Sequence, residues 1–247
     1  MKTKSILLFA CIIIATSSFA QGRLLENWAV GLNAGLYGYG IHGATSLAPN
    51  FKARIGFDYM AYTYKDGIEF DADVLKNGEL LDYTYSGEFS TAKLQFPNVK
   101  AMIDYYPMKT GVFCFTAGVY LGNNKISLNG KVYDYNHNPD RPNIGFEDVI
   151  IQPNSDGSFD ANLKLGNFVK PYFGIGLGRT IPKSRVGFKF ELGIVYQGEF
   201  RLESKNAISH NGYSTSDFFD DLDDLPVSKE VFKLWPMMNF TLSYKIK

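Results

Sequence analysis

Hydrophobic and polar residues alternate with a period of two along most of residues 159–200. Apolar side chains take the odd positions from 159 to 177 and, after a break at 181–185, the even positions from 186 to 200. This period predicts strands with one apolar and one polar face, because successive side chains point to opposite sides of the pleat. Each run matches or exceeds the roughly 9–11 residues that a tilted strand needs to cross a bilayer. The stretch therefore predicts a membrane-spanning β-hairpin.

The same alternation predicts six further strands, which makes eight in all. They cover residues 28–35, 39–47, 51–62, 92–105, 113–121 and 232–246. The glycines of 35–40 allow a tight reversal, so 28–47 is divided into two strands, and this division sets the strand number to eight. In the fourth strand the apolar residues change phase at Pro97, which predicts a β-bulge there, because an extra residue re-aims every later side chain.

The connections between these strands alternate in length. Short turns lie at 48–50, 107–111 and 181–185, whereas the connections at 66–88, 127–158 and 202–229 are long. Short turns on one side and three long outer loops on the other are typical of outer-membrane barrels. Within hydrocarbon, strands can span only if the sheet closes and leaves no edge. The pattern thus predicts an all-β, eight-stranded antiparallel up-and-down transmembrane β-barrel.

Three segments carry a family resemblance: NVKAMIDYYPM, KPYFGIGLGR and RVGFKFELGIVYQG. With them, nearly the whole mature sequence resembles the small eight-stranded outer-membrane β-barrel proteins of Gram-negative bacteria. The resemblance implies contact with outer-membrane lipid and insertion by the barrel assembly machinery. Members of this family usually end on an aromatic residue that the insertion machinery reads, and this chain departs from that pattern by ending at Lys247.

The N-terminus predicts export. Lys2 and Lys4 precede an apolar core at 6–15, and the small-x-small site at 18–20 follows it. These are the parts of a cleaved secretory signal peptide covering residues 1–20, which leaves a single barrel domain at 21–247 and predicts an outer-membrane location. Residues 8–11 also resemble a lipoprotein cleavage site that ends at Cys11. Cys11 lies early in the apolar core, so its lipidation stays open.

Charge is distributed unevenly along a chain whose net charge is zero. The three long connections hold 18 acidic and 5 basic residues, whereas the rest of the mature chain holds 7 acidic and 18 basic residues. The acidic loops are interpreted either as solvated loops that favour solubility, or as loops that fold over the mouth or bind divalent cations or another extracellular ligand. The balanced total argues against a nucleic-acid partner. The 16 Tyr and 20 Phe fit aromatic girdles at the two membrane interfaces.

Eight strands enclose a space barely wide enough for their own side chains, so the polar rows predict a packed lumen with ion pairs across strands. The charges expected inside are Lys52, Arg54, Lys100, Lys164, Lys170, Lys189 and Lys233 against Asp58, Asp104, Asp160, Glu191 and Glu199. Alternation alone leaves the opposite orientation open. A soluble, secreted lipocalin-like barrel would turn its apolar row inward around a small apolar ligand.

The sequence predicts no catalytic, cofactor-binding or metal-binding residue. His42 is expected as a hydrogen-bonded lumen residue, while His137 and the pair Ser209-His210 lie in long connections without a third orienting group for a nucleophile. Residues 217–225 lack the glycine and glutamate of a calcium loop and predict a short amphipathic helix. Cys114 is expected to pack inside a strand.

These features together predict a non-enzymatic outer-membrane barrel with a plugged polar lumen. Its long acidic loops would act in surface structure, adhesion or envelope integrity. Two alternatives remain open from the sequence: the soluble lipocalin-like barrel, and a lipid-modifying enzyme built on an outer-membrane barrel.

Overall fold

The computed structural model describes residues 25–76, 79–108, 111–132, 143–146, 149–151, 153–204, 208–209 and 233–246. These residues form strands and connections. None of the described segments is a helix long and apolar enough to cross a membrane. The predicted signal peptide at 1–20 and the predicted helix at 217–225 lie outside the described residues.

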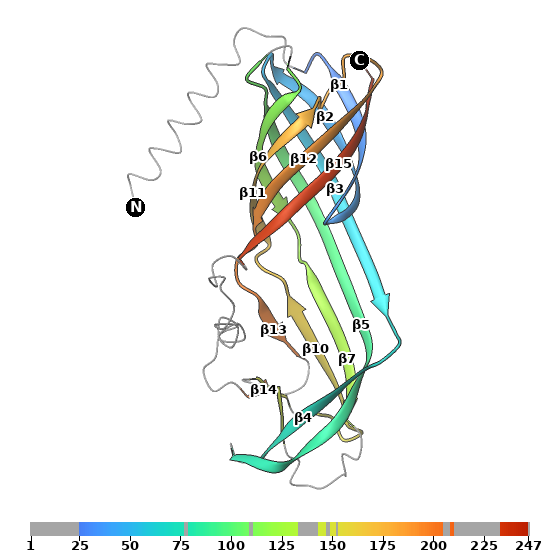
Figure 1. Cartoon of the computed structure of the whole chain (residues 1–247), viewed down its shortest axis with the longest axis vertical. Helices are drawn as coiled ribbons and strands as arrows, with labels where there is room; N and C mark the ends of the chain where they lie inside the picture. Colours follow the sequence, from blue (N-terminus) through green and yellow to red (C-terminus); the bar gives the residue numbers. More distant parts are fainter. Residues whose placement is uncertain are drawn as a thin grey trace, which may run out of the picture.

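Eight strands close into a ring in which each strand is antiparallel to both neighbours (Figure 1). In ring order they are β1 (Trp28–Gly35), β2 (Gly38–Ala48), β3 (Phe51–Tyr64), β5 (Glu79–Tyr105), β6 (Phe113–Leu121), β11 (Val169–Gly178), β12 (Val186–Tyr196) and β15 (Leu234–Lys245). The ring closes where β15 pairs with β1. The predicted eight-stranded antiparallel barrel is thereby confirmed.

Beyond one end of the ring, the sheet continues as an outer extension. The 27-residue β5 passes out of the ring and pairs with β4 (Ile68–Lys76) and β7 (Lys125–Val132). From β7 the sheet continues through β10 (Ser158–Lys164) to β13 (Arg201–Glu203), and from β4 through β8 (Asn143–Phe146) and β9 (Val149–Ile151) to β14 (Ile208–Ser209). The long connections, expected as loops, therefore contain strands that widen the sheet on both sides of the extended β5.

The run predicted as one strand at 159–177 is divided in two by Gly166. This glycine has φ +85°, where a side chain is strained, and a Cβ there would lie 2.2 Å from the backbone oxygen of Gln197. The N–H of Leu165 donates to the oxygen of Asn124 at 2.8 Å, so the break is held by a backbone hydrogen bond. Below it β10 belongs to the outer extension, and above it β11 belongs to the ring (Figure 1).

The β-bulge predicted at Pro97 is wrong. Pro97 pairs with Tyr59, and the register with the other neighbours continues unbroken from Gln95 opposite Lys125 to Val99 opposite Leu121. The even positions of β5 face inward on both sides of the proline. What changes is the content of the interior: Leu94 and Phe96 belong to an apolar cluster, whereas Lys100 and Asp104 enter a polar one. The hydrophobic phase therefore changes without any change in the direction of the side chains.

Within the ring, the apolar rows face outward and the charged rows face inward, as the barrel interpretation predicts. Ile55 is 68 % exposed and Phe188 is 75 % exposed, whereas Lys189 and Glu191 are each 2 % exposed. The charges enclosed as expected are Arg54, Lys100, Lys170, Lys189, Asp58, Asp104 and Glu191. The soluble alternative requires the reverse orientation of both rows.

Five charges expected in the lumen are not enclosed. Lys164 forms a 2.6 Å ion pair with Glu203 in the exposed part of the outer extension, and Glu199 is exposed. Lys52, Asp160 and Lys233 are partly exposed. Asp160 and Lys164 belong to the outer extension, Glu199 and Lys233 lie just beyond the ends of β12 and β15, and Lys52 lies at the short-turn end of the ring. The polar row is enclosed only in the middle of the closed ring.

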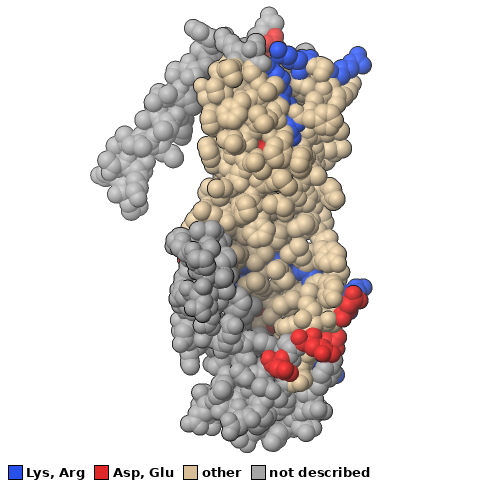
Figure 2. Space-filling model, in the orientation of Figure 1, with Lys and Arg blue, Asp and Glu red and all other residues tan. Residues whose placement is uncertain are grey.

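Charged side chains gather at the two ends of the molecule (Figure 2). On the face shown, Lys and Arg cluster at the end with the short turns, Asp and Glu lie on the outer extension, and the wide band between them is almost free of charge at its surface. An outward apolar band between two polar ends is the surface expected of a barrel that spans a bilayer.

Candidate functional site

The interior of the ring contains a cluster of four buried ions from three strands. Arg54 of β3 lies 2.8 Å from Asp104 of β5 and 2.7 Å from Glu191 of β12. Lys189, two positions before Glu191 and on the same face of β12, lies 2.9 Å from Asp104 and 2.7 Å from Glu191. Each cation contacts both carboxylates, so the two positive and two negative charges balance. We call these four residues the ion cluster.

The ion cluster joins opposite walls of the barrel. In the ring, β3 and β12 lie diametrically opposite, so the contact between Arg54 and Glu191 crosses the full width of the interior. Hydroxyl groups complete the cluster: Thr116 donates to Asp104 at 2.6 Å, Thr180 donates to the other oxygen of Asp104, and Tyr172 donates to Glu191 at 2.7 Å. Burying charges is tolerable only with this degree of pairing and hydrogen bonding.

A second polar group lies beside the ion cluster. The ammonium of Lys100 on β5 lies 2.7 Å from Asp58 on β3 and 2.8 Å from the side-chain oxygen of Asn33 on β1. The amide of Asn33 donates to the same Asp58 oxygen at 2.9 Å. This triad connects three strands on the wall of the barrel away from β12. The ion pairs that the sequence predicts across strands are thus confirmed.

An aromatic layer fills the interior toward the outer extension. It consists of Tyr37, Phe96, Tyr120, Tyr172 and Trp235, which meet edge to face. Ring centroids are 5.1 Å apart for Tyr37 and Tyr120, and 5.6 Å apart for Tyr120 and Tyr172. These contacts run from β15 across β5 and the β1–β2 turn to β6 and β11. Edge-to-face packing of this kind stabilises beyond simple burial of area.

The sequence did not reveal the aromatic layer, although one signal was present. Tyr120 and Tyr172 lie on the polar rows of their strands, at inward positions in phase with Thr116 and Lys170. Tyrosine tolerates such a position because its ring packs while its hydroxyl finds a polar partner. Tyr172 does both, since its ring meets Tyr120 and its hydroxyl reaches the ion cluster.

His42 lies on the inner wall as predicted, but it is not hydrogen-bonded to the described residues. It is 4 % exposed, and neither ring nitrogen has a partner in the described part of the chain. Its neighbours across the two adjacent strands are Gly31 and Gly56, which offer no side chain. The imidazole lies over Gly31, where a Cβ would approach the ring to 2.3 Å. The glycines thus make room for the ring and offer it no polar side chain.

The other residues weighed for chemistry do not form a site in the described structure. Cys114 is a buried free cysteine on the inward row of β6, as the packing interpretation predicts. Ser209 belongs to β14, while His137 and His210 lie outside the described residues. Across the described segments, no group of three or more His, Cys, Asp or Glu side chains has the arrangement of a metal site.

Comparisons with known proteins find similarity at the level of structure. No protein-family model and no curated protein matches the chain. The crystal structure of Acinetobacter baumannii CarO2 is similar with a TM-score of 0.50 and 18 % identity, over 91 % of this chain and 100 % of that one. This chain has an outer-membrane-type β-barrel fold.

Two further solved structures are similar over most of their length, with lower scores. Acinetobacter baumannii CarO matches 87 % of this chain and 96 % of its own, with a TM-score of 0.48 and 16 % identity. A major outer membrane protein from Thermus thermophilus matches 89 % of this chain and 98 % of its own, with a TM-score of 0.38 and 13 % identity.

Proposed function

We propose that this protein is a non-enzymatic outer-membrane β-barrel whose lumen is plugged by its own side chains. The observation that carries the proposal is the contact of Arg54 with Glu191 at 2.7 Å, which joins opposite walls of the ring. A barrel of eight strands has room inside for little more than its side chains. The ion cluster and the aromatic layer then act as two successive barriers along the axis.

The outer extension supports a role at the cell surface. It carries the exposed pair of Lys164 and Glu203 and acidic side chains such as Asp71, and it continues the barrel beyond the apolar band. Paired strands that project from a plugged barrel suit surface structure, adhesion or envelope integrity better than transport. Binding of divalent cations or of an extracellular ligand by these acidic segments remains part of this proposal.

The soluble lipocalin-like alternative is disfavoured by the direction of the side chains. A ligand-binding barrel of that class needs an apolar cavity inside. The interior of this barrel is instead filled by the charged side chains of the ion cluster and by the aromatic layer. It would also have to expose Ile55, Phe188 and their neighbours to water around the whole ring. An apolar surface of that extent is unusual for a soluble monomer.

Conductance in planar bilayers tests the plug. We expect the purified protein to insert without stepwise conductance, because the ion cluster and the aromatic layer block the axis. The triple variant Arg54→Ala, Tyr37→Ala and Phe96→Ala removes the central side chains of both barriers. We expect it to show discrete conductance steps.

The matched control replaces three outward side chains of the ring, Ile55, Phe188 and Phe240, with alanine and should stay silent. Stepwise conductance of the unmodified protein would contradict the plug. The surface role is tested separately by comparing detergent sensitivity and surface attachment of cells with and without the gene. Unchanged behaviour in both assays would remove that part of the proposal.

A further inference from the structure

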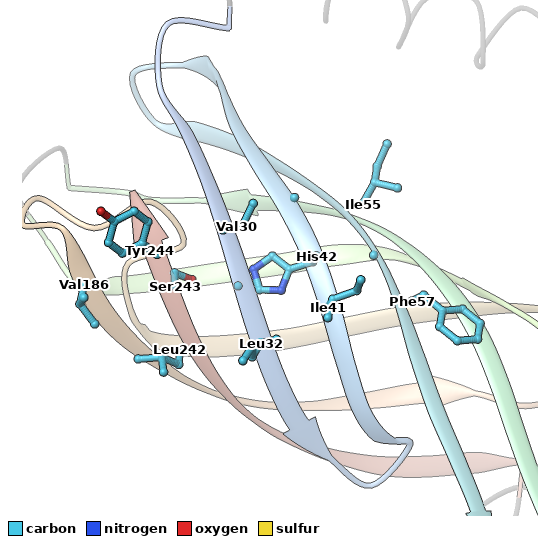
Figure 3. A pocket seen from close by; sticks show the side chains of 13 residues that line it. Val30, Leu32, Ile41, His42, Ile55, Phe57, Val186, Leu242, Ser243 and Tyr244 are labelled. Carbon is cyan, nitrogen blue, oxygen red and sulfur yellow. The ribbon is translucent and has the colours of Figure 1, made fainter. Parts of the chain in front are cut away.

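A groove of about 710 Å³ lies in the outer wall of the barrel, over β1, β2 and β3 and the neighbouring ends of β12 and β15 (Figure 3). Its walls are outward apolar side chains, including Val30, Ile41, Ile55 and Leu242, each at least 41 % exposed. Its volume lies within the range of roughly 300–1,000 Å³ found for ligand pockets. Outward apolar side chains make up most of this lining, and His42 and Ser243 of the inward rows also contribute to it.

Gly43 creates the hollow. It lies on the outward row of β2, between Val30 on one neighbouring strand and Ile55 on the other. A Cβ at this position would meet nothing within 4 Å, whereas a Cβ at most other described glycines would clash. Because Gly43 has no side chain, the otherwise apolar outward row has a gap at this position. The aliphatic side chains around the gap bound the groove.

One end of the groove reaches the basic rim of the barrel. Val186 and Tyr244 line that end and pair with each other, and the adjacent Arg185 and Lys245 are joined by a backbone hydrogen bond of 2.7 Å. The described residues at this rim also include Arg179 and Lys183, with Glu26 as the acidic side chain. Figure 2 shows this gathering of positive charge at the end with the short turns.

Aromatic side chains mark the same level. Trp28 at the start of β1 is 44 % exposed, and its indole N–H donates to the oxygen of Leu25 at 2.9 Å. Tyr244, which lines the groove, is 47 % exposed. Trp and Tyr with an apolar body and a polar tip are typical of the layer where hydrocarbon meets headgroups. The groove thus begins at the level of lipid headgroups and runs into the hydrocarbon.

We propose that this groove binds one anionic phospholipid of the periplasmic leaflet. An acyl chain lies over Gly43 against Val30 and Ile55, and the phosphate lies at the rim against Arg185, the exposed residue before Val186. Lys245, at the end of the inward row of β15, adds positive charge behind it. The proposal rests on the proposed membrane location, with the short turns at the periplasmic side. A largely aliphatic groove in the lipid-facing wall selects hydrocarbon, and the basic rim selects a headgroup with net negative charge. Each Lys or Arg near a membrane surface contributes about 1 kcal/mol of attraction to anionic lipid.

Native mass spectrometry of the detergent-solubilised mature protein, with equal amounts of phosphatidylglycerol and phosphatidylethanolamine, tests the site. We expect one tightly retained lipid and a preference for phosphatidylglycerol on the order of tenfold, as two basic side chains provide. Arg185→Gln with Lys245→Gln should abolish the preference while retaining the chain contact. Gly43→Leu fills the groove and should lower retention of both lipids by about tenfold.

Two matched controls should change nothing. Ala117→Leu places the same leucine side chain on the outward row of β6, away from the groove, and Lys164→Gln removes a base from the outer extension. Equal retention of both lipids by the unmodified protein, or unchanged retention in Gly43→Leu, would overturn the proposal. A dimer mass that Gly43→Leu abolishes would assign the groove to a second copy and overturn it as well.

Heat-dependent gel mobility separates this proposal from the proposed function. Folded barrels migrate differently before and after boiling, so every variant is first shown to keep this shift. If only Gly43→Leu loses the mobility shift, that variant is misfolded. The lipid preference of the double variant at Arg185 and Lys245 then tests the proposed site. Absence of the shift and of membrane insertion in the unmodified protein would remove the proposed function itself.

Discussion

Replacing Arg54 with methionine should destabilise the folded barrel by about 3–5 kcal/mol. The guanidinium is 4 % exposed and contacts Asp104 and Glu191, so its removal leaves two buried carboxylates to share Lys189. Removing one partner of a buried ion pair costs far more than the pair contributes when intact, because the remaining charge stays desolvated. Urea unfolding of the protein refolded into lipid vesicles, followed by gel mobility, measures the change.

Lys164→Met is the matched control. Lys164 also pairs with a carboxylate, Glu203 at 2.6 Å, but both side chains are exposed. An exposed pair contributes little, so the loss should stay below about 1 kcal/mol. Equal effects of the two substitutions would show that the ion cluster is accessible to water and does not close the interior.

Replacing Phe240 with arginine should cost about 2–4 kcal/mol of folding stability in vesicles. Phe240 lies midway along β15, is 56 % exposed and packs against Phe190 with ring centroids 4.9 Å apart. If this outward face contacts hydrocarbon, a charge there loses its hydration without gaining a partner. The same urea titration in vesicles measures the loss.

Phe168→Arg provides a control of equal exposure. Phe168 is 55 % exposed and lies just before β11, at the outer end of the apolar band. The cost of a charge on the lipid face falls to about 0–1 kcal/mol near the interface. A soluble barrel would give a different result, since Phe240→Arg would then exchange an exposed aromatic for a solvated charge at little cost.

The alternation of side chains predicted most of the ring. Phe188 and Lys189 point to opposite sides as expected, because the pleat alone decides this and needs no knowledge of neighbouring strands. Closure and the number of strands followed from the glycines at 35–40 and from the alternating lengths of the connections. The end of the ring was harder to place, because β5 continues into the outer extension without a local signal at its boundary.

What the sequence could not give depends on contacts across the ring. Arg54 and Glu191 are 137 positions apart, and only closure of the barrel in this strand order brings them within 2.7 Å. The hydrophobic pattern at Pro97 predicts a bulge that the structure does not have, because a shift of the backbone and a change in what fills the interior produce the same pattern. His42 illustrates the same limit, since its lack of a hydrogen-bond partner among the described residues reflects glycines on two other strands.

Spin-label accessibility at Phe188 tests the central claim most directly, namely that the apolar rows face lipid and the charged rows are enclosed. Phe188→Cys is prepared in a Cys114→Ala background, labelled with a nitroxide and reconstituted in vesicles, with Lys183→Cys in the short turn as the reference for water. We predict that the label at 188 collides with dissolved oxygen and is shielded from a water-soluble nickel chelate, whereas the label at 183 meets the chelate freely. Equal exposure of both labels to the chelate would contradict the account.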